Sequence, residues 1–128
     1  MQWFKQARRT DIWEETIEVP IGDIEAAKRI REICRSAADS AERVGSATDR
    51  THKKIRHEVE RYERAARAAM ELAMKVSDEL LRDAAVRQIV ELCLKARHVT
   101  TAQTLLRAIQ SNSIRDDVLR EHPHLSGE

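Results

Sequence analysis

The chain has 128 residues, of which 35% are charged and 3% are aromatic, and its formal net charge is +1. This length suits one domain with a hydrophobic core and is too short for two, and the near-neutral charge does not by itself indicate a polyanionic partner. With only three glycines and two prolines, the chain lacks the turn residues that β-hairpins need, so its core has to be built from Ala, Leu, Ile and Val on helices. The composition therefore predicts an all-α fold.

The cysteines and the hydropathy pattern bear on the cellular setting. Cys34 and Cys93 are far apart in apolar helical stretches, with no close pair of the kind found in zinc or redox motifs, so we expect buried free thiols. No stretch approaches the roughly 18 apolar residues of a membrane span, and the start lacks the apolar region of a secretory signal. We expect a cytoplasmic protein with no membrane partner.

The first 21 residues differ from the rest of the chain. They hold Trp3, Phe4 and Trp13, most of the aromatic residues, and alternating apolar positions up to Ile21 favour an extended segment with one apolar edge. We interpret residues 1–21 as an N-terminal arm anchored by these three aromatic side chains. The arm is expected either to fold onto its own bundle or to dock on a second subunit or a partner.

Residues 23–76 carry apolar side chains at alternating spacings of three and four, a pattern typical of helices that pack lengthwise. The first helix is expected to begin near Gly22 or Asp23, where Asp23 can cap it. Gly45 and the polar residues after it indicate a helix stop and a new start. We predict an antiparallel hairpin whose second helix covers about 49–76. One unbroken helix is the alternative, because a lone glycine inside a helix costs only about 1 kcal/mol.

Shorter helices are predicted after the hairpin. Asp78 can cap a third helix that runs to about Ala96 and is apolar over a broad arc, which is typical of the central helix of a bundle. Thr100 can start a short fourth helix, and Ser111 begins a polar break before a last turn or two. The predicted fold is an antiparallel helical bundle with a long hairpin, a central apolar third helix and one or two short C-terminal helices.

The predicted organisation is an arm over residues 1–21, a helical bundle over 22–121 and a frayed tail over 122–128. The helices of the hairpin are longer than the remaining chain can easily cover, so a second copy should bury part of their surface. Small residues that would allow close contact form the predicted interaction seam: Ala27, Ala37, Ala41, Ala66, Ala69 and Ala73.

Basic residues of the second helix gather on its expected outer side, over a length on the order of 25 Å. This basic strip consists of Arg50, Lys53, Lys54, His57, Arg61, Arg64 and Arg67. Phosphates or an acidic helix could dock there. The alternative is a solvated face supported by intrahelical pairs such as Glu60 with Arg64.

Metal-binding motifs are weakly represented. Dinuclear carboxylate bundles need two Glu-x-x-His motifs on facing helices, and the only literal instance is Glu121 with His124, which spans Pro123. We therefore predict no metal site and no other cofactor.

Catalytic motifs are equally weak, and we predict no catalytic residue. Arg115 with His122, and Arg50 with His57, have the spacing used by HEPN-type ribonucleases, but pairs at this spacing are expected by chance in a chain so rich in arginine. His57 lies on a helical hairpin, where a phosphoacceptor histidine would be placed.

The sequence therefore predicts architecture better than chemistry. We expect a non-enzymatic interaction or assembly protein that acts as a homo-oligomer and contacts an unidentified protein partner. Nucleic-acid binding through the basic strip is the alternative, and an HEPN-type ribonuclease or a His phosphotransfer domain is a minor one.

Overall fold

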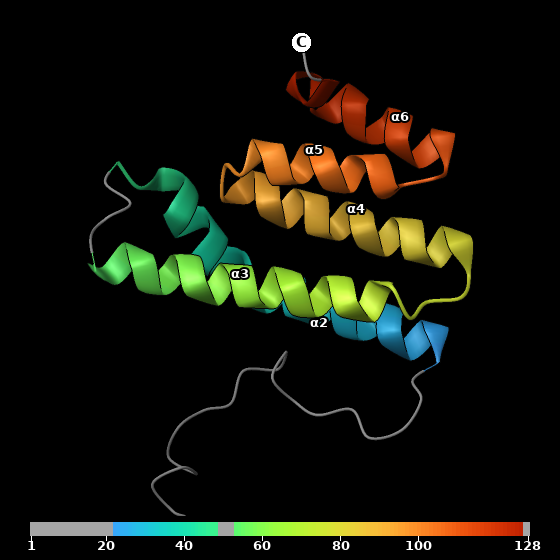
Figure 1. Ribbon diagram of the computed structural model, residues 1–128, viewed down its shortest axis with the longest axis horizontal. Coiled ribbons are helices and arrows are strands. Elements are labelled where there is room, and N and C mark those ends of the chain that lie inside the picture. The colour runs from blue at the N-terminus through green and yellow to red at the C-terminus, as the bar shows by residue number, and fades with distance from the viewer. Residues whose placement is uncertain (1–21, 49–52, 127–128) are drawn as a thin grey trace, which may run out of the picture.

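The computed structural model describes residues 22–48 and 53–126, and the secondary structure of these residues is helical (Figure 1). The elements are α2 (Asp23–Ser46), α3 (Lys53–Ala73), α4 (Glu79–Lys95), α5 (Val99–Ala108), α6 (Asn112–Glu121) and the short 3-10 helix η2 (Pro123–Ser126). The all-α prediction is confirmed. The predicted arm, the start predicted for the second helix at 49–52 and the end of the predicted tail at 127–128 lie outside the described residues.

Helices α2 and α3 form the predicted antiparallel hairpin, and the chain reverses its direction between Ser46 and Lys53 (Figure 1). This reversal excludes the alternative of one unbroken helix. The core face of α2 includes Ile30, Ala37 and Ala41. The buried residues of α3 are Tyr62, Ala65, Ala69, Leu72 and Ala73. None of the described helices is long and apolar enough to cross a membrane.

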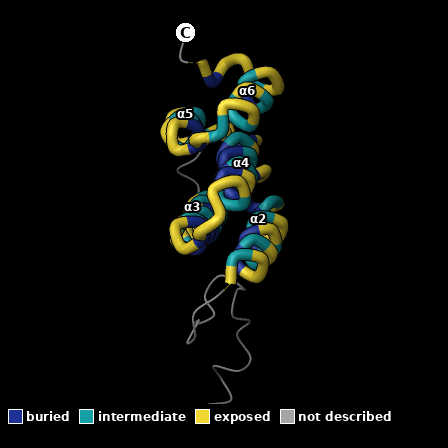
Figure 2. Tube along the Cα trace, turned by 90° about the vertical axis from the view of Figure 1, so that its right-hand side faces the viewer, coloured by how far each residue is buried: buried dark blue, intermediate teal, exposed yellow. Residues whose placement is uncertain are grey.

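Helix α4 is the central element, as predicted. It contacts α2 and α3 on one side and α5 and α6 on the other, and Figure 2 shows it between these two pairs with much of its surface buried. Its many apolar positions point in several directions because neighbours surround it. Asp78 caps α4 as expected: its Oδ1 accepts a hydrogen bond from the backbone N–H of Leu81 at 2.9 Å.

Helix α2 ends at Ser46, so the predicted helix stop around Gly45 is confirmed, and the structure gives Gly45 a further role. Helix α2 continues to Ser46, so Gly45 lies inside its last turn and is buried. A Cβ atom at this position would overlap the backbone carbonyl of Lys95, at the end of α4. Glycine is therefore needed at position 45 because two helix ends approach each other there, which a single-helix pattern cannot reveal.

Asp23 also acts differently from its predicted role as a cap. It is the first residue of α2, and its two carboxylate oxygens accept hydrogen bonds from the backbone N–H groups of Ser77 (2.9 Å) and Asp78 (2.8 Å). These bonds lower the pKa of the Asp23 carboxyl. The carboxylate thereby joins the start of α2 to the loop between α3 and α4.

Asp83 of α4 fixes the corner between α5 and α6. Its side chain is fully buried, and its Oδ2 accepts hydrogen bonds from the backbone N–H groups of Gln110 (3.2 Å) and Ser111 (2.8 Å). Ser111, predicted to begin a polar break, caps α6 through a 3.3 Å bond from the backbone N–H of Ile114. The break is thus a tight corner held by a buried carboxylate.

The described part of the predicted tail belongs to the bundle. Pro123–Ser126 form η2, whose Leu125 is buried in the core, and the ring of His122 reaches Glu91 of α4. The prediction that the chain frays from His122 onward is wrong for these residues, because one apolar side chain and one polar contact return it to the bundle.

Glu58 connects the two helices of the hairpin. Its carboxylate accepts hydrogen bonds from the hydroxyl of Ser40 (2.7 Å) and from the guanidinium of Arg43 (2.8 Å), both on α2. Partial burial raises the pKa of Glu58, but the two donors and the charge of Arg43 outweigh this effect, so the pKa lies below its ordinary value.

Replacing Glu58 with Gln is expected to reduce the loss of stability in acid. Because folding lowers the pKa of Glu58, its contribution to the free energy of unfolding is complete above the ordinary value of 4.5 and is lost as the pH falls through the lower folded value. Urea unfolding at neutral and acid pH measures this loss, with Glu60→Gln on the outer side of the same helix as the control. If Glu58→Gln and the parent lost the same free energy of unfolding between neutral and acid pH, the lowered pKa assigned to Glu58 would be contradicted.

Candidate functional site

The predicted interaction seam lies largely inside the chain. Ala37, Ala41, Ala69 and Ala73 have no exposed surface in the bundle, where α2 and α3 pack against each other and against α4. The two others are partly exposed: Ala27 and Ala66. Close approach of helices at small residues is therefore found within one chain, and four of the six alanines have no surface left to contact a second copy.

The basic strip is narrower than predicted. Its exposed members among the described residues are Lys53, Lys54, His57, Arg64 and Arg67. Arg61 turns toward α2, where its Nε donates to the hydroxyl of Ser40 (3.1 Å) and its Nη2 to the carbonyl of Ser36 (3.4 Å). Glu60 is exposed on the same outer face, and Arg50 lies outside the described residues. The cations that remain on the surface therefore form an interrupted row.

Arg115 and His122, which have the spacing of one minor catalytic alternative, make structural contacts. The guanidinium of Arg115 donates from Nη2 to the carbonyls of Ile109 (3.0 Å) and Gln110 (3.3 Å), which steadies the corner between α5 and α6. His122, which the spacing paired with Arg115, is directed to Glu91 instead.

The two cysteines are free thiols, as predicted; Cys93 is buried, whereas Cys34 is only partly buried. Burial, together with the neighbouring Cys93, raises the pKa of the Cys34 thiol to about 12. Burial likewise raises the pKa of Cys93, against a hydrogen bond with Tyr62. Both shifts disfavour the thiolate, which is the nucleophilic form of cysteine.

Three exposed apolar side chains mark one end of the bundle. Among the described residues, the large apolar side chains that are exposed are Ile24 (80%), Met74 (73%) and Leu80 (64%). They lie where α2 begins, α3 ends and α4 begins, around the contact of Asp23 with the loop before α4 (Figure 1). We call these three side chains the apolar end.

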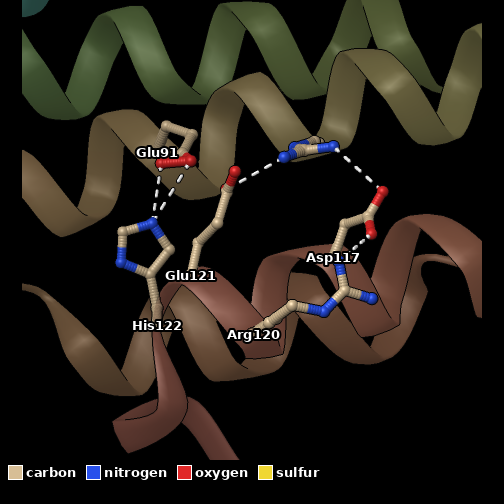
Figure 3. Close-up of polar contacts among 6 residues, drawn as sticks. Glu91, Asp117, Arg120, Glu121 and His122 are labelled. Carbon is tan, nitrogen blue, oxygen red and sulfur yellow. Dashed lines mark hydrogen bonds and ion pairs between the residues drawn. The ribbon is translucent and has the colours of Figure 1, made fainter.

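A cluster of two carboxylates and one histidine lies between α4 and the end of α6 (Figure 3). Nε2 of His122 is 3.0 Å from Oε1 and 3.3 Å from Oε2 of Glu91, and Glu121 precedes His122 at the end of α6. One ligand atom from each of the three residues lies within 4.8 Å of the others. We call Glu91, Glu121 and His122 the carboxylate–histidine cluster.

The cluster borders an open pocket of about 520 Å³. Glu91 and His122 line this pocket together with His124, whose ring meets the ring of His122 edge-on with 6.1 Å between centroids. Lys95 and Arg97 add positive charge to its wall. The pocket thus brings two imidazoles and one carboxylate together beside the cluster.

The sequence carries little signal for this cluster. Its only Glu-x-x-His pattern pairs Glu121 with His124, whereas the structure joins Glu121 with its neighbour His122 and with Glu91, which lies 31 positions before His122. The apolar arc of the third helix indicates packing, and its polar positions do not form a local motif for metal binding. Only the folding of α6 back onto α4 brings the three residues together.

Comparison with known proteins does not assign the chain to a family. No protein-family model matches the chain, and neither a curated protein nor a solved structure is similar to it. The arguments about function therefore start from the residues themselves.

Proposed function

We propose that this protein is a non-enzymatic assembly protein that self-associates, with a second copy of the chain seated on the apolar end. The observation that supports this most directly is that Ile24, Met74 and Leu80 are all exposed and lie at the end of the bundle where α2 begins, α3 ends and α4 begins. Single exposed apolar residues are ordinary on protein surfaces, but several at one place are typical of interaction sites.

The sequence of residues 1–21 supports the same surface. This segment joins the bundle at Gly22, next to Ile24, and it contains Trp3, Phe4 and Trp13. A stable dimer buries about 800 Å² per partner, which three aliphatic side chains cannot supply alone. Each aromatic side chain can bury about 150–250 Å², so the apolar end and the anchors of residues 1–21 together provide the area that a dimer needs.

The outer face of α3 supports nucleic-acid binding less well. Arg61 is directed to α2 and Glu60 is exposed among the cations, so phosphates would meet an interrupted row of positive charge. Self-association is therefore the stronger proposal.

The triple variant Ile24→Glu, Met74→Glu and Leu80→Glu is expected to convert an oligomer into a monomer. Three carboxylates at the contact would have to lose their hydration on association, which is strongly unfavourable. The variant should fold, because the three side chains are exposed in the parent and acidic residues suit the first turns of α2 and α4. Light scattering gives the mass, and far-UV circular dichroism checks the helicity.

The matched control places three glutamates at the opposite end of the bundle, at exposed polar positions: Ser46, Thr100 and Thr101. This control should keep the mass of the parent. A folded apolar-end variant with the same mass as an oligomeric parent would show that the second copy binds elsewhere, and a monomeric parent would overturn self-association itself.

A further inference from the structure

The carboxylate–histidine cluster has a donor set and a geometry that suit a metal ion. Glu91 comes from near the end of α4, while Glu121 and His122 come from the end of α6, so two helices fix the three side chains (Figure 3). Tetrahedral coordination with bonds of about 2.0–2.1 Å places donor atoms about 3.3 Å apart. Nε2 of His122 and Oε1 of Glu91 are already 3.0 Å apart, and all three donors lie within 4.8 Å of one another, so Glu121 has to move toward the other two donors to complete this geometry.

The charges around the cluster allow this change. Arg87 donates from Nη2 to Oε1 of Glu121 at 2.9 Å, and its Nη1 lies 4.0 Å from Oδ2 of Asp117. When Glu121 turns toward an ion, Arg87 keeps a carboxylate partner in Asp117. His122 is the C-cap of α6, and the C-terminal end of a helix carries the partial negative charge that favours a cation. Lys95 and Arg97, which line the same pocket as Glu91 and His122, act against a cation, so the two carboxylates of the cluster have to outweigh them.

The donor types indicate the class of ion. One imidazole nitrogen with two carboxylate oxygens suits zinc(II) and neighbouring first-row divalent ions, whereas magnesium and calcium prefer sets made of oxygen alone. Three protein ligands leave a coordination position open, and the pocket lined by His124 lies next to it.

We propose that Glu91, Glu121 and His122 form a binding site for one zinc-like divalent ion per chain, with an open coordination position facing the pocket. This site goes beyond the proposed self-association, since it lies on α4 and α6 and uses no residue of the apolar end. Its chemistry is compatible with binding an anionic or nitrogen-donor ligand at the open position.

Calorimetric titration with zinc chloride tests the site on the full chain. The parent is expected to bind one zinc ion per chain, and Glu91→Gln and His122→Asn are each expected to weaken binding by at least about tenfold, because even residues outside the coordination shell alter affinity by 10–100-fold. Glu79→Gln, at an exposed glutamate on the same helix, is the matched control and should bind as the parent does. Magnesium chloride should give no comparable binding.

Two further measurements make the result decisive. Far-UV circular dichroism checks that each variant is folded, and Cys34→Ser tests whether thiols supply the ligands; this variant should bind zinc as the parent does. A parent that binds no zinc would overturn the proposal. Unchanged affinity in folded Glu91→Gln and His122→Asn would overturn it as well, and neither result bears on the mass of the protein.

Discussion

Gly45→Ala is expected to destabilise the bundle by about 3 kcal/mol, because forcing an extra carbon into a packed contact costs roughly 1–3 kcal/mol and more where backbone must move. A Cβ at position 45 would overlap the carbonyl of Lys95, which belongs to the end of α4 and cannot rotate away. Either the last turn of α2 or the end of α4 has to shift, and both pack against the core.

Whether Gly45→Ala stabilises or destabilises the protein distinguishes two explanations of why glycine occupies position 45. If Gly45 served only to end a helix in open space, alanine would stabilise the last turn of α2 by up to about 1 kcal/mol. Urea unfolding followed by circular dichroism measures the difference. Ser46→Ala, at the exposed neighbouring position, is the control and should change stability by less than about 0.5 kcal/mol. A Gly45→Ala protein as stable as the parent would contradict the close approach of α2 and α4.

Asp83→Ala is expected to destabilise the protein by about 2–3 kcal/mol, since each hydrogen bond to a charged group contributes roughly 1.5–3 kcal/mol and part of this is offset by removal of a buried charge. The variant leaves the backbone N–H groups of Gln110 and Ser111 without the carboxylate that accepts from both. Oδ1 of Asp83 has no hydrogen-bond partner among the described residues, so burial of this carboxylate is only partly compensated.

Thermal unfolding of Asp83→Ala and of Asp116→Ala provides the comparison, because Asp116 is an exposed aspartate of α6. The control should unfold close to the parent. Hydrogen exchange at the corner between α5 and α6 should accelerate in Asp83→Ala before it does elsewhere. Equal stability of the two variants would show that the buried carboxylate does not hold this corner.

The fold was predictable where it depends on local pattern. Spacings of three and four predicted the hairpin. The cap at Asp78 and the polar residues around Ser111 predicted where α4 and α6 begin, and the apolar arc predicted that α4 is the central helix. Each of these signals acts over one or two helical turns, a distance that sequence patterns encode.

The candidate sites were not predictable in the same way. The contact of Gly45 with Lys95, the bonds from Asp83 to the corner near Ser111, and the cluster around His122 all join residues that are distant in sequence. The alanine seam was recognisable as a packing face, but the packed arrangement buries Ala37, Ala41, Ala69 and Ala73 inside one chain. The sequence pattern indicates which face of a helix is apolar, whereas only the packing of the helices determines which element covers that face.

Sedimentation equilibrium of the full chain, from dilute to concentrated solution, tests the central claim of self-association most directly. A mass of two or more chains that falls toward one chain on dilution is the predicted result, because the apolar end and the anchors of residues 1–21 would be buried between copies. A mass of one chain at every concentration would contradict it.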